Sequence, residues 1–117
     1  ANVGVWRLSI AMERGEPGQV RRLAPTIDTT GMTSPNRLSR YYVEQGRAHA
    51  RLGEHDQAVA LLLRAEHASP QYVRTRLVVR ELVGHMLRDS RRRAVSDRLG
   101  ALARRCGAVP PTRRPGR

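Results

Sequence analysis

The chain of 117 residues contains no lysine and no phenylalanine, and it has a single cysteine and a single tryptophan. It also lacks any run of 18 apolar residues, which excludes a membrane-spanning helix. A single cysteine excludes an internal disulfide and favours a reducing compartment. No charged segment followed by an apolar run opens the sequence, so no signal peptide is apparent. These absences predict a cytoplasmic protein that does not enter the membrane.

The patterns of common catalytic and metal sites are missing as well. The four histidines show no metal-ligand spacing, and one cysteine cannot build a zinc site. The acidic residues are not paired for acid–base chemistry, and no phosphate-binding loop or nucleophile motif occurs. Cys106 falls on the apolar face of an expected helix, which indicates a buried, inert thiol. We therefore expect a non-enzymatic protein without a metal or a cofactor.

The charge is strongly positive and unevenly distributed. All 22 basic residues are arginine, and ten acidic residues leave a net charge of +12. Residues 88–117 hold ten arginines against two acidic residues. Proline, glycine and arginine dominate residues 110–117, which predicts a disordered basic tail. Such a tail could touch nucleic-acid phosphates without reading sequence. No aromatic residues lie between its arginines to stack on bases, so a solvated tail is the simpler interpretation.

Apolar residues recur at helical spacing along the chain, and no segment shows a strand pattern. Six helices are expected, over residues 2–14, 17–27, 35–52, 55–68, 71–88 and 91–106. They pair into three hairpins, over residues 2–30, 34–69 and 71–107, so the expected fold class is all-α. In the first helix Trp6 and Ile10 are expected to face the core.

The middle hairpin carries the most specific pattern. Its characteristic positions are occupied by Tyr42, Gly46, His49, Gly53, Ala58, Leu62, Ala65 and Pro70. This spacing is typical of the tetratricopeptide repeat, although His49 replaces the usual tyrosine. Gly46 and Ala58 would let two helices cross closely. Gly53 can adopt a left-handed cap conformation, and Pro70 cannot continue the second helix. An unrelated helical hairpin with a glycine turn is the alternative.

Parts of this pattern occur twice. Gly15-Glu16 recurs as Gly53-Glu54, and Ser34-Pro35 recurs as Ser69-Pro70. Stacked hairpins of this kind bury a continuous core. We therefore expect residues 1–109 to form a tetratricopeptide-like, right-handed stack of three antiparallel hairpins, an α-α superhelix.

A stack of this kind has a concave face formed by the first helix of each pair. On the middle first helix, Arg40, Arg47 and Arg51 share one side. The matching positions on the other two are Asn2, Ser9, Glu13, Arg74, Glu81 and His85. Guanidinium groups bind carboxylates in bidentate fashion. The arginines, with Arg74 and Asn2, therefore predict a groove for a peptide ligand, although a solvated arginine face is the alternative.

Several segments also occur in a characteristic order. They are Asn2–Ala11, Gly15–Gly18, Ser34–Arg37, Glu66–Pro70, Val79–Leu82 and Leu102–Gly107. In this order they resemble the C-terminal region of actinobacterial helix-turn-helix transcriptional regulators of the Cro/repressor (XRE) type, over residues 2–109. The resemblance implies a module that senses a ligand, forms a homodimer, or both. DNA would be bound by a separate N-terminal domain, because this chain shows no compact helix-turn-helix.

Two functions remain open at this point. The first is the sensor or dimerisation part of such a regulator. The alternative is a free-standing adaptor that binds an acidic peptide or a protein C-terminus. A third and weaker hypothesis is nonspecific nucleic-acid binding through the tail.

Overall fold

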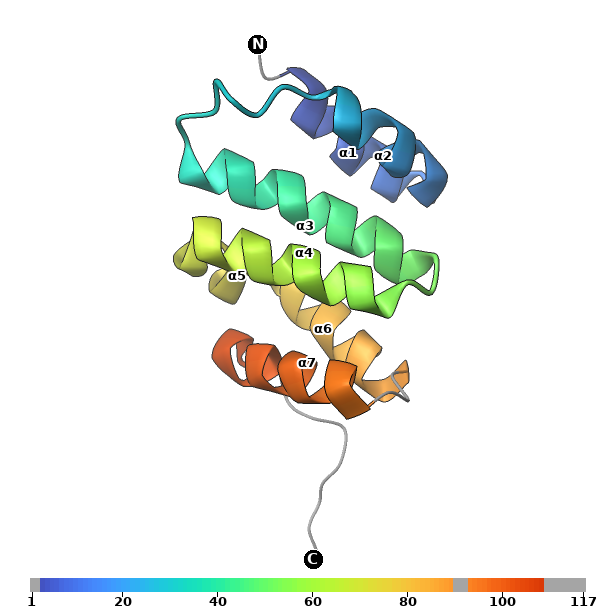
Figure 1. Ribbon diagram of the computed structural model, residues 1–117, viewed down its shortest axis with the longest axis vertical. Coiled ribbons are helices and arrows are strands. Elements are labelled where there is room, and N and C mark those ends of the chain that lie inside the picture. The colour runs from blue at the N-terminus through green and yellow to red at the C-terminus, as the bar shows by residue number, and fades with distance from the viewer. Residues whose placement is uncertain (1–2, 90–92, 109–117) are drawn as a thin grey trace, which may run out of the picture.

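The computed structural model describes residues 3–89 and 93–108, and within these ranges it contains helices, turns and loops but no strand (Figure 1). The elements are α1 (Val3–Glu13), α2 (Pro17–Leu23), the 3-10 helix η1 (Ala24–Thr26), α3 (Pro35–Arg51), α4 (His55–Ala68), α5 (Pro70–Thr75), α6 (Leu77–Asp89) and α7 (Arg93–Cys106). The helices lie in successive layers, with α1 and α2 at one end and α7 at the other. The predicted all-α class is confirmed. The predicted tail at 110–117 lies outside the described residues.

Two serines begin helices at the positions where the sequence repeats. The Ser34 hydroxyl accepts a hydrogen bond from the backbone N–H of Arg37 at 3.3 Å, which caps α3. The Ser69 hydroxyl accepts one from the N–H of Tyr72 at 3.4 Å and caps α5. Such caps satisfy backbone donors that have no partner inside the helix. Pro70 occupies the first turn of α5, so it follows the end of one helix and begins the next.

A left-handed glycine closes the turn between α3 and α4. Gly53 has a φ of 80°, a conformation that side chains with a Cβ rarely adopt. The N–H of Glu54 donates to the His49 carbonyl at 2.8 Å, and the N–H of Gly53 donates to the Ala50 carbonyl at 3.0 Å. These bonds satisfy carbonyls at the end of α3. The short turn makes α3 and α4 an antiparallel pair.

The helices α3 and α4 approach each other closely at Gly46. A Cβ added there would stand 3.2 Å from two side-chain carbons of Leu62 and 3.4 Å from the Ala58 carbonyl oxygen. Leu62, Ala58 and Ala65 are fully buried. A larger residue at Gly46 would therefore push the two helices apart.

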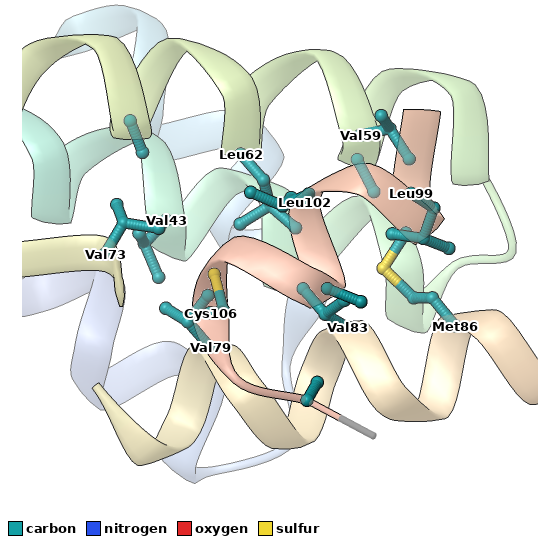
Figure 2. Packing of buried hydrophobic residues seen from close by; sticks show 14 residues of the cluster. Val43, Val59, Leu62, Val73, Val79, Val83, Met86, Leu99, Leu102 and Cys106 are labelled. Carbon is teal, nitrogen blue, oxygen red and sulfur yellow. The ribbon is translucent and has the colours of Figure 1, made fainter. Parts of the chain in front are cut away.

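Two clusters of buried apolar side chains form the core, and α3 contributes to both. The larger cluster comprises Val43, Ala58, Val59, Leu62, Ala65, Val73, Val79, Val83, Met86, Leu99, Leu102, Ala103, Cys106 and Ala108. Figure 2 shows its side chains filling the space enclosed by α3, α4, α6 and α7. The smaller cluster comprises Leu8, Ala11, Met12, Val20, Ala24 and Ala48. The helix α3 thus joins the first hairpin to the rest of the chain.

The prediction of a single helix over residues 71–88 is wrong. Arg76 is extended, with φ −85° and ψ 124°, and it separates α5 from α6. Its guanidinium carbon lies 4.2 Å from the centroid of the Tyr72 ring, one turn earlier. The Thr75 hydroxyl donates to the Gln71 carbonyl at 2.7 Å. The break redirects the chain, so α5 and α6 run in different directions (Figure 1).

The predicted inner face of α1 is also wrong. The side chains of α1 that enter the core are Val5, Leu8, Ala11 and Met12. Trp6 and Ile10 are instead 46% and 38% exposed. Both sets recur at helical spacing, so periodicity alone could not choose between the two faces.

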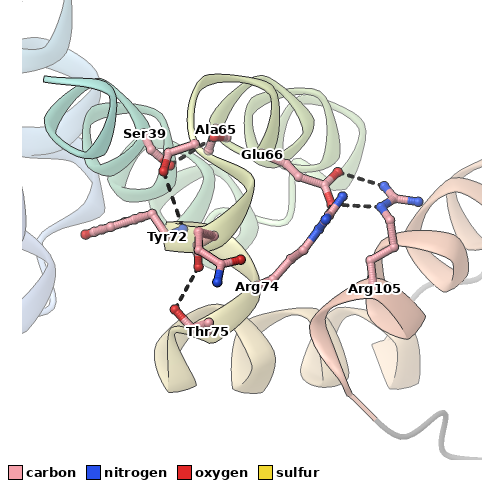
Figure 3. A network of polar contacts seen from close by, with 9 residues as sticks. Ser39, Ala65, Glu66, Tyr72, Arg74, Thr75 and Arg105 are labelled. Carbon is pink, nitrogen blue, oxygen red and sulfur yellow. Dashed lines mark hydrogen bonds and ion pairs between the residues drawn. The ribbon is translucent and has the colours of Figure 1, made fainter. Parts of the chain in front are cut away.

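A buried carboxylate links α4, α5 and α7 (Figure 3). Glu66 is only 8% exposed. It accepts two hydrogen bonds from Arg105, at 2.7 and 2.8 Å, and one from Arg74 at 3.0 Å. The hydrogen bonds from Arg105, followed by the one from Arg74, hold the pKa of Glu66 below its usual value despite burial. The ionised carboxylate therefore stabilises the folded chain.

We predict that Gly46→Val destabilises the fold, because its side chain would collide with fully buried Leu62. Overpacking of this kind costs about 1–3 kcal/mol. Gly84→Val is the matched control, because a Cβ there would meet only the end of the Arg88 side chain, at 3.7 Å. We expect that control to change stability by about 0.5 kcal/mol or less. Urea denaturation measures both, and equal losses would contradict the proposed crossing.

We predict that Glu66→Gln lowers the free energy of unfolding at neutral pH by about 1–3 kcal/mol, because charged hydrogen bonds are lost. Since the folded-state pKa of Glu66 lies below its ordinary value of 4.5, its contribution is present above pH 4.5 and is lost as the pH falls through the folded-state pKa. Urea denaturation between pH 7 and pH 3 should show a shallower acid decline for the variant. Glu81→Gln, at an exposed residue of α6, is the control and should leave the profile unchanged. Parallel declines for wild type and Glu66→Gln would contradict the role of this carboxylate.

Candidate functional site

A cavity of about 680 Å³ opens between α1, α3 and the joint of α5 and α6. We call it the groove. It is lined by Val5, Trp6, Ser9, Glu13, Ser34, Asn36, Arg37, Arg40, Glu44, Arg47, Tyr72, Arg76 and Val78. Its volume falls within the range of cavities that hold small molecules or short peptide segments.

The two helices that form the walls of the groove, α1 and α3, run in the same chain direction. The two ends of the groove therefore differ. The helices α1 and α3 run the same way in adjacent layers, from the side where α5 lies toward the α3–α4 turn (Figure 1). The Ser69 hydroxyl donates to the Asn36 side chain at 2.7 Å, which places the start of α5 beside the start of α3. The first residues of α1, α3 and α5 therefore meet at one end, which we call the entry end. The last turns of α1 and α3 form the far end.

Ser9 organises the middle of the groove. Its hydroxyl donates to Glu44 Oε2 at 2.9 Å and accepts hydrogen bonds from Arg40 Nε and Nη2, at 3.0 and 2.7 Å. Arg47 Nη1 donates to Glu44 Oε1 at 2.8 Å. Glu44 is 6% exposed, and both of its oxygens have the partners that a buried carboxylate requires. The cluster fixes the directions of Arg40 and Arg47 along the wall.

The unpaired positive charge lies at the entry end and in the middle of the groove. Arg47 is paired with Glu44. Within residues 3–89 and 93–108, no carboxylate pairs with Arg37, Arg40 or Arg76. Three guanidinium groups thus line the entry end and the middle of the cavity without pairing with a carboxylate of the described residues.

Aromatic and apolar side chains border the same end. Trp6 is half exposed on α1, and Val5 adjoins it in the chain. Across the groove the Tyr72 ring stacks with the Arg76 guanidinium. Val78 is 38% exposed at the start of α6. The entry end therefore combines positive charge with apolar surface.

The structure does not bring together the five residues predicted for the ligand groove. Arg40 and Arg47 line the groove. Arg51 is exposed and is not among the lining residues. Arg74 belongs to the Glu66 network between α4, α5 and α7. Asn2 lies outside the described residues.

Arg37, Arg76, Tyr72 and Trp6 are among the lining residues that sequence reasoning missed. Arg37 stands one helical turn before Arg40, so the same spacing argument could have included it. Tyr72 and Arg76 reach the cavity because the chain breaks between α5 and α6. The spacing of apolar residues gives no sign of this break. Trp6 was assigned to the core.

The remaining predicted repeat positions lie at helix contacts. Tyr42 packs against the larger cluster, makes an edge-on contact with Tyr41 at 5.4 Å, and has the Arg64 guanidinium over its ring. His49 Nδ1 lies 2.6 Å from Glu54 Oε1 at the α3–α4 turn. Neither Tyr42 nor His49 lines the groove.

The described residues contain no group of three histidine, cysteine or acidic side chains that could hold a metal ion. Nor does any helix in these ranges have the length and apolar character needed to cross a membrane. Cys106 is buried, and burial raises the pKa of its thiol. No protein-family model, curated protein or solved structure matches the chain. The inference of function therefore rests on the groove and on the sequence patterns.

We predict that the emission of Trp6, the only tryptophan, reports an aqueous environment in the folded protein. Its emission should be red-shifted, and acrylamide should quench it readily in the folded protein because the side chain is 46% exposed. We also expect Trp6→Ala to lower the free energy of unfolding by about 1 kcal/mol or less. Leu8→Ala, at a fully buried residue of the same helix, should cost about 2–5 kcal/mol. A shielded, blue-shifted emission would place Trp6 in the core and contradict the structure.

Proposed function

We propose that the chain is a non-enzymatic, tetratricopeptide-like interaction module that binds an anionic peptide in the groove. The observation that carries the proposal is the set of unpaired guanidinium groups of Arg37, Arg40 and Arg76, which line one cavity beside Trp6 and Tyr72. Positive groups left unpaired in a cavity of this size attract an anionic ligand.

The arrangement of helices supports the tetratricopeptide-like part of the proposal. The groove is lined by the first helix of the first and second hairpins and by the α5–α6 joint of the third. The close crossing at Gly46 and the left-handed Gly53 are features that the repeat requires. We accordingly propose a right-handed stack of three hairpins with a peptide-binding concave side.

Arg40 is the side chain best prepared to bind a carboxylate. Ser9 already holds its guanidinium through Nε and Nη2, so little side-chain freedom remains to be lost on binding. The remaining N–H groups are available for a ligand, because arginine carries five donors. Charge-assisted hydrogen bonds of this kind contribute about 1.5–3 kcal/mol each.

The resemblance to Cro/repressor-type regulators supports a regulatory role for this module. In that proposal the ligand changes the geometry of the stack or of a homodimer, and an attached DNA-binding domain responds. The free-standing adaptor is the second candidate, and the same groove would serve it. The reading frame upstream of the codon for Ala1 separates them, since a fused helix-turn-helix domain supports the regulator and another kind of preceding sequence supports the adaptor.

We predict that Arg40→Gln weakens the binding of anionic peptides by about tenfold or more, because a charge-assisted hydrogen bond is lost. The probe is a pool of acetylated pentapeptides that contain aspartate and glutamate and end in free carboxylates. Quenching of Trp6 fluorescence and calorimetry would measure binding. Arg51→Gln is the matched control, because it removes the same charge from the same helix outside the groove. Equal losses from both variants, or no binding to the wild type, would contradict the proposal.

A further inference from the structure

The groove is not uniformly positive along its length. Its far end carries Glu13, which pairs with no basic residue in the described ranges, and its middle holds buried Glu44, whose charge is balanced by Arg47. Two of the unpaired arginines, Arg37 and Arg76, lie toward its entry end, and the third, Arg40, lies beside Ser9 in the middle of the groove. A ligand that fits this distribution needs its negative charge at one end only.

An acidic stretch does not meet this requirement. In an extended peptide a negative charge at each residue would recur about every 3.3 Å. Such a chain, laid along α3, would bring carboxylates past Glu13 and Glu44. Like charges in a partly buried site repel, so a run of acidic residues is a poor match for the far end.

A peptide C-terminus meets the requirement, because its single carboxylate stands on the same Cα as the last side chain. At the entry end the arginines adjoin the partly exposed side chains of Trp6, Tyr72 and Val78. These residues offer an apolar surface for a large last side chain beside the guanidinium groups that would hold the carboxylate.

The far end adds a condition on the preceding residues. Trp6 and Glu13 are seven positions apart on α1, which corresponds to about 10 Å along a helix. An extended peptide covers that distance in about three residues. A basic residue three positions before the C-terminus would then stand opposite Glu13.

We propose that the groove binds the C-terminus of a peptide in one direction, with the free carboxylate at Arg37, Arg40 and Arg76. A large apolar last side chain packs at Trp6 and Tyr72, and a basic residue upstream faces Glu13. This inference rests on the proposed peptide-binding function and specifies the ligand that the site selects.

The test uses the acetylated peptide Gly-Lys-Gly-Ala-Leu, with Trp6 quenching and calorimetry as readouts. The free acid should bind about tenfold or more tightly than its C-terminal amide, because the amide cannot accept the charged hydrogen bonds. Replacing the last leucine with glycine, or the lysine with glutamate, should weaken binding severalfold. The acid form should also bind more tightly than pentapeptides rich in aspartate and glutamate.

A charge reversal at Glu13 makes the test specific. Glu13 is exposed, so Glu13→Arg should leave the fold intact. We expect the variant to prefer the peptide with glutamate in place of lysine, whereas Arg51→Gln should keep the wild-type preference. Equal binding of acid and amide, or a lysine preference unaffected by Glu13→Arg, would overturn the inference. Tighter binding of the acidic pentapeptides would overturn it and leave the proposed function standing, whereas no binding of any peptide would remove both.

Discussion

The packing of Gly46 against Leu62 is the constraint on which the rest of the structure depends. Because α3 can approach α4 so closely there, its opposite side remains free to pack on α1 and α2 through Ala48. One helix thereby serves two hydrophobic clusters. The third side of α3 carries Arg40, Glu44 and the other polar residues of the groove wall. The contact between Gly46 and Leu62 therefore determines where that wall lies.

The charge of the groove follows from the burial of one carboxylate. Glu44 can remain in the wall because Ser9 and Arg47 satisfy its two oxygens. This pairing removes Arg47 from the set of free cations and leaves Arg40 bound only to a neutral hydroxyl. The difference in charge between the two ends of the groove therefore has two causes. One is the number of arginines, and the other is the pairing of Glu44 with Arg47 inside the wall.

The sequence contains the local chemistry that begins and ends most helices. Gly53 adopts the left-handed conformation predicted for it, and Ser34 and Ser69 cap helices at the two places where the sequence repeats, because capping depends on neighbours in the chain. Two predictions that needed tertiary contacts failed. Two sets of apolar residues on α1 recur at helical spacing, so the spacing does not show which set faces the core. The prediction that Trp6 faces the core was therefore wrong. The helix break at Arg76 was missed because residues 71–88 keep an apolar spacing across it.

The same break determines how the groove joins the rest of the chain. Glu66 fixes α5 to α4 and α7 through Arg74 and Arg105, whereas α6 begins immediately after Arg76. Arg76 is therefore both part of the groove wall and the joint between a fixed short helix and a longer one that packs on α7. In the proposed regulator, a carboxylate held by Arg76 would act directly on that joint. The Tyr72 ring stacks on the Arg76 guanidinium and holds it in a defined position. A ligand carboxylate would have to move the guanidinium away from that position.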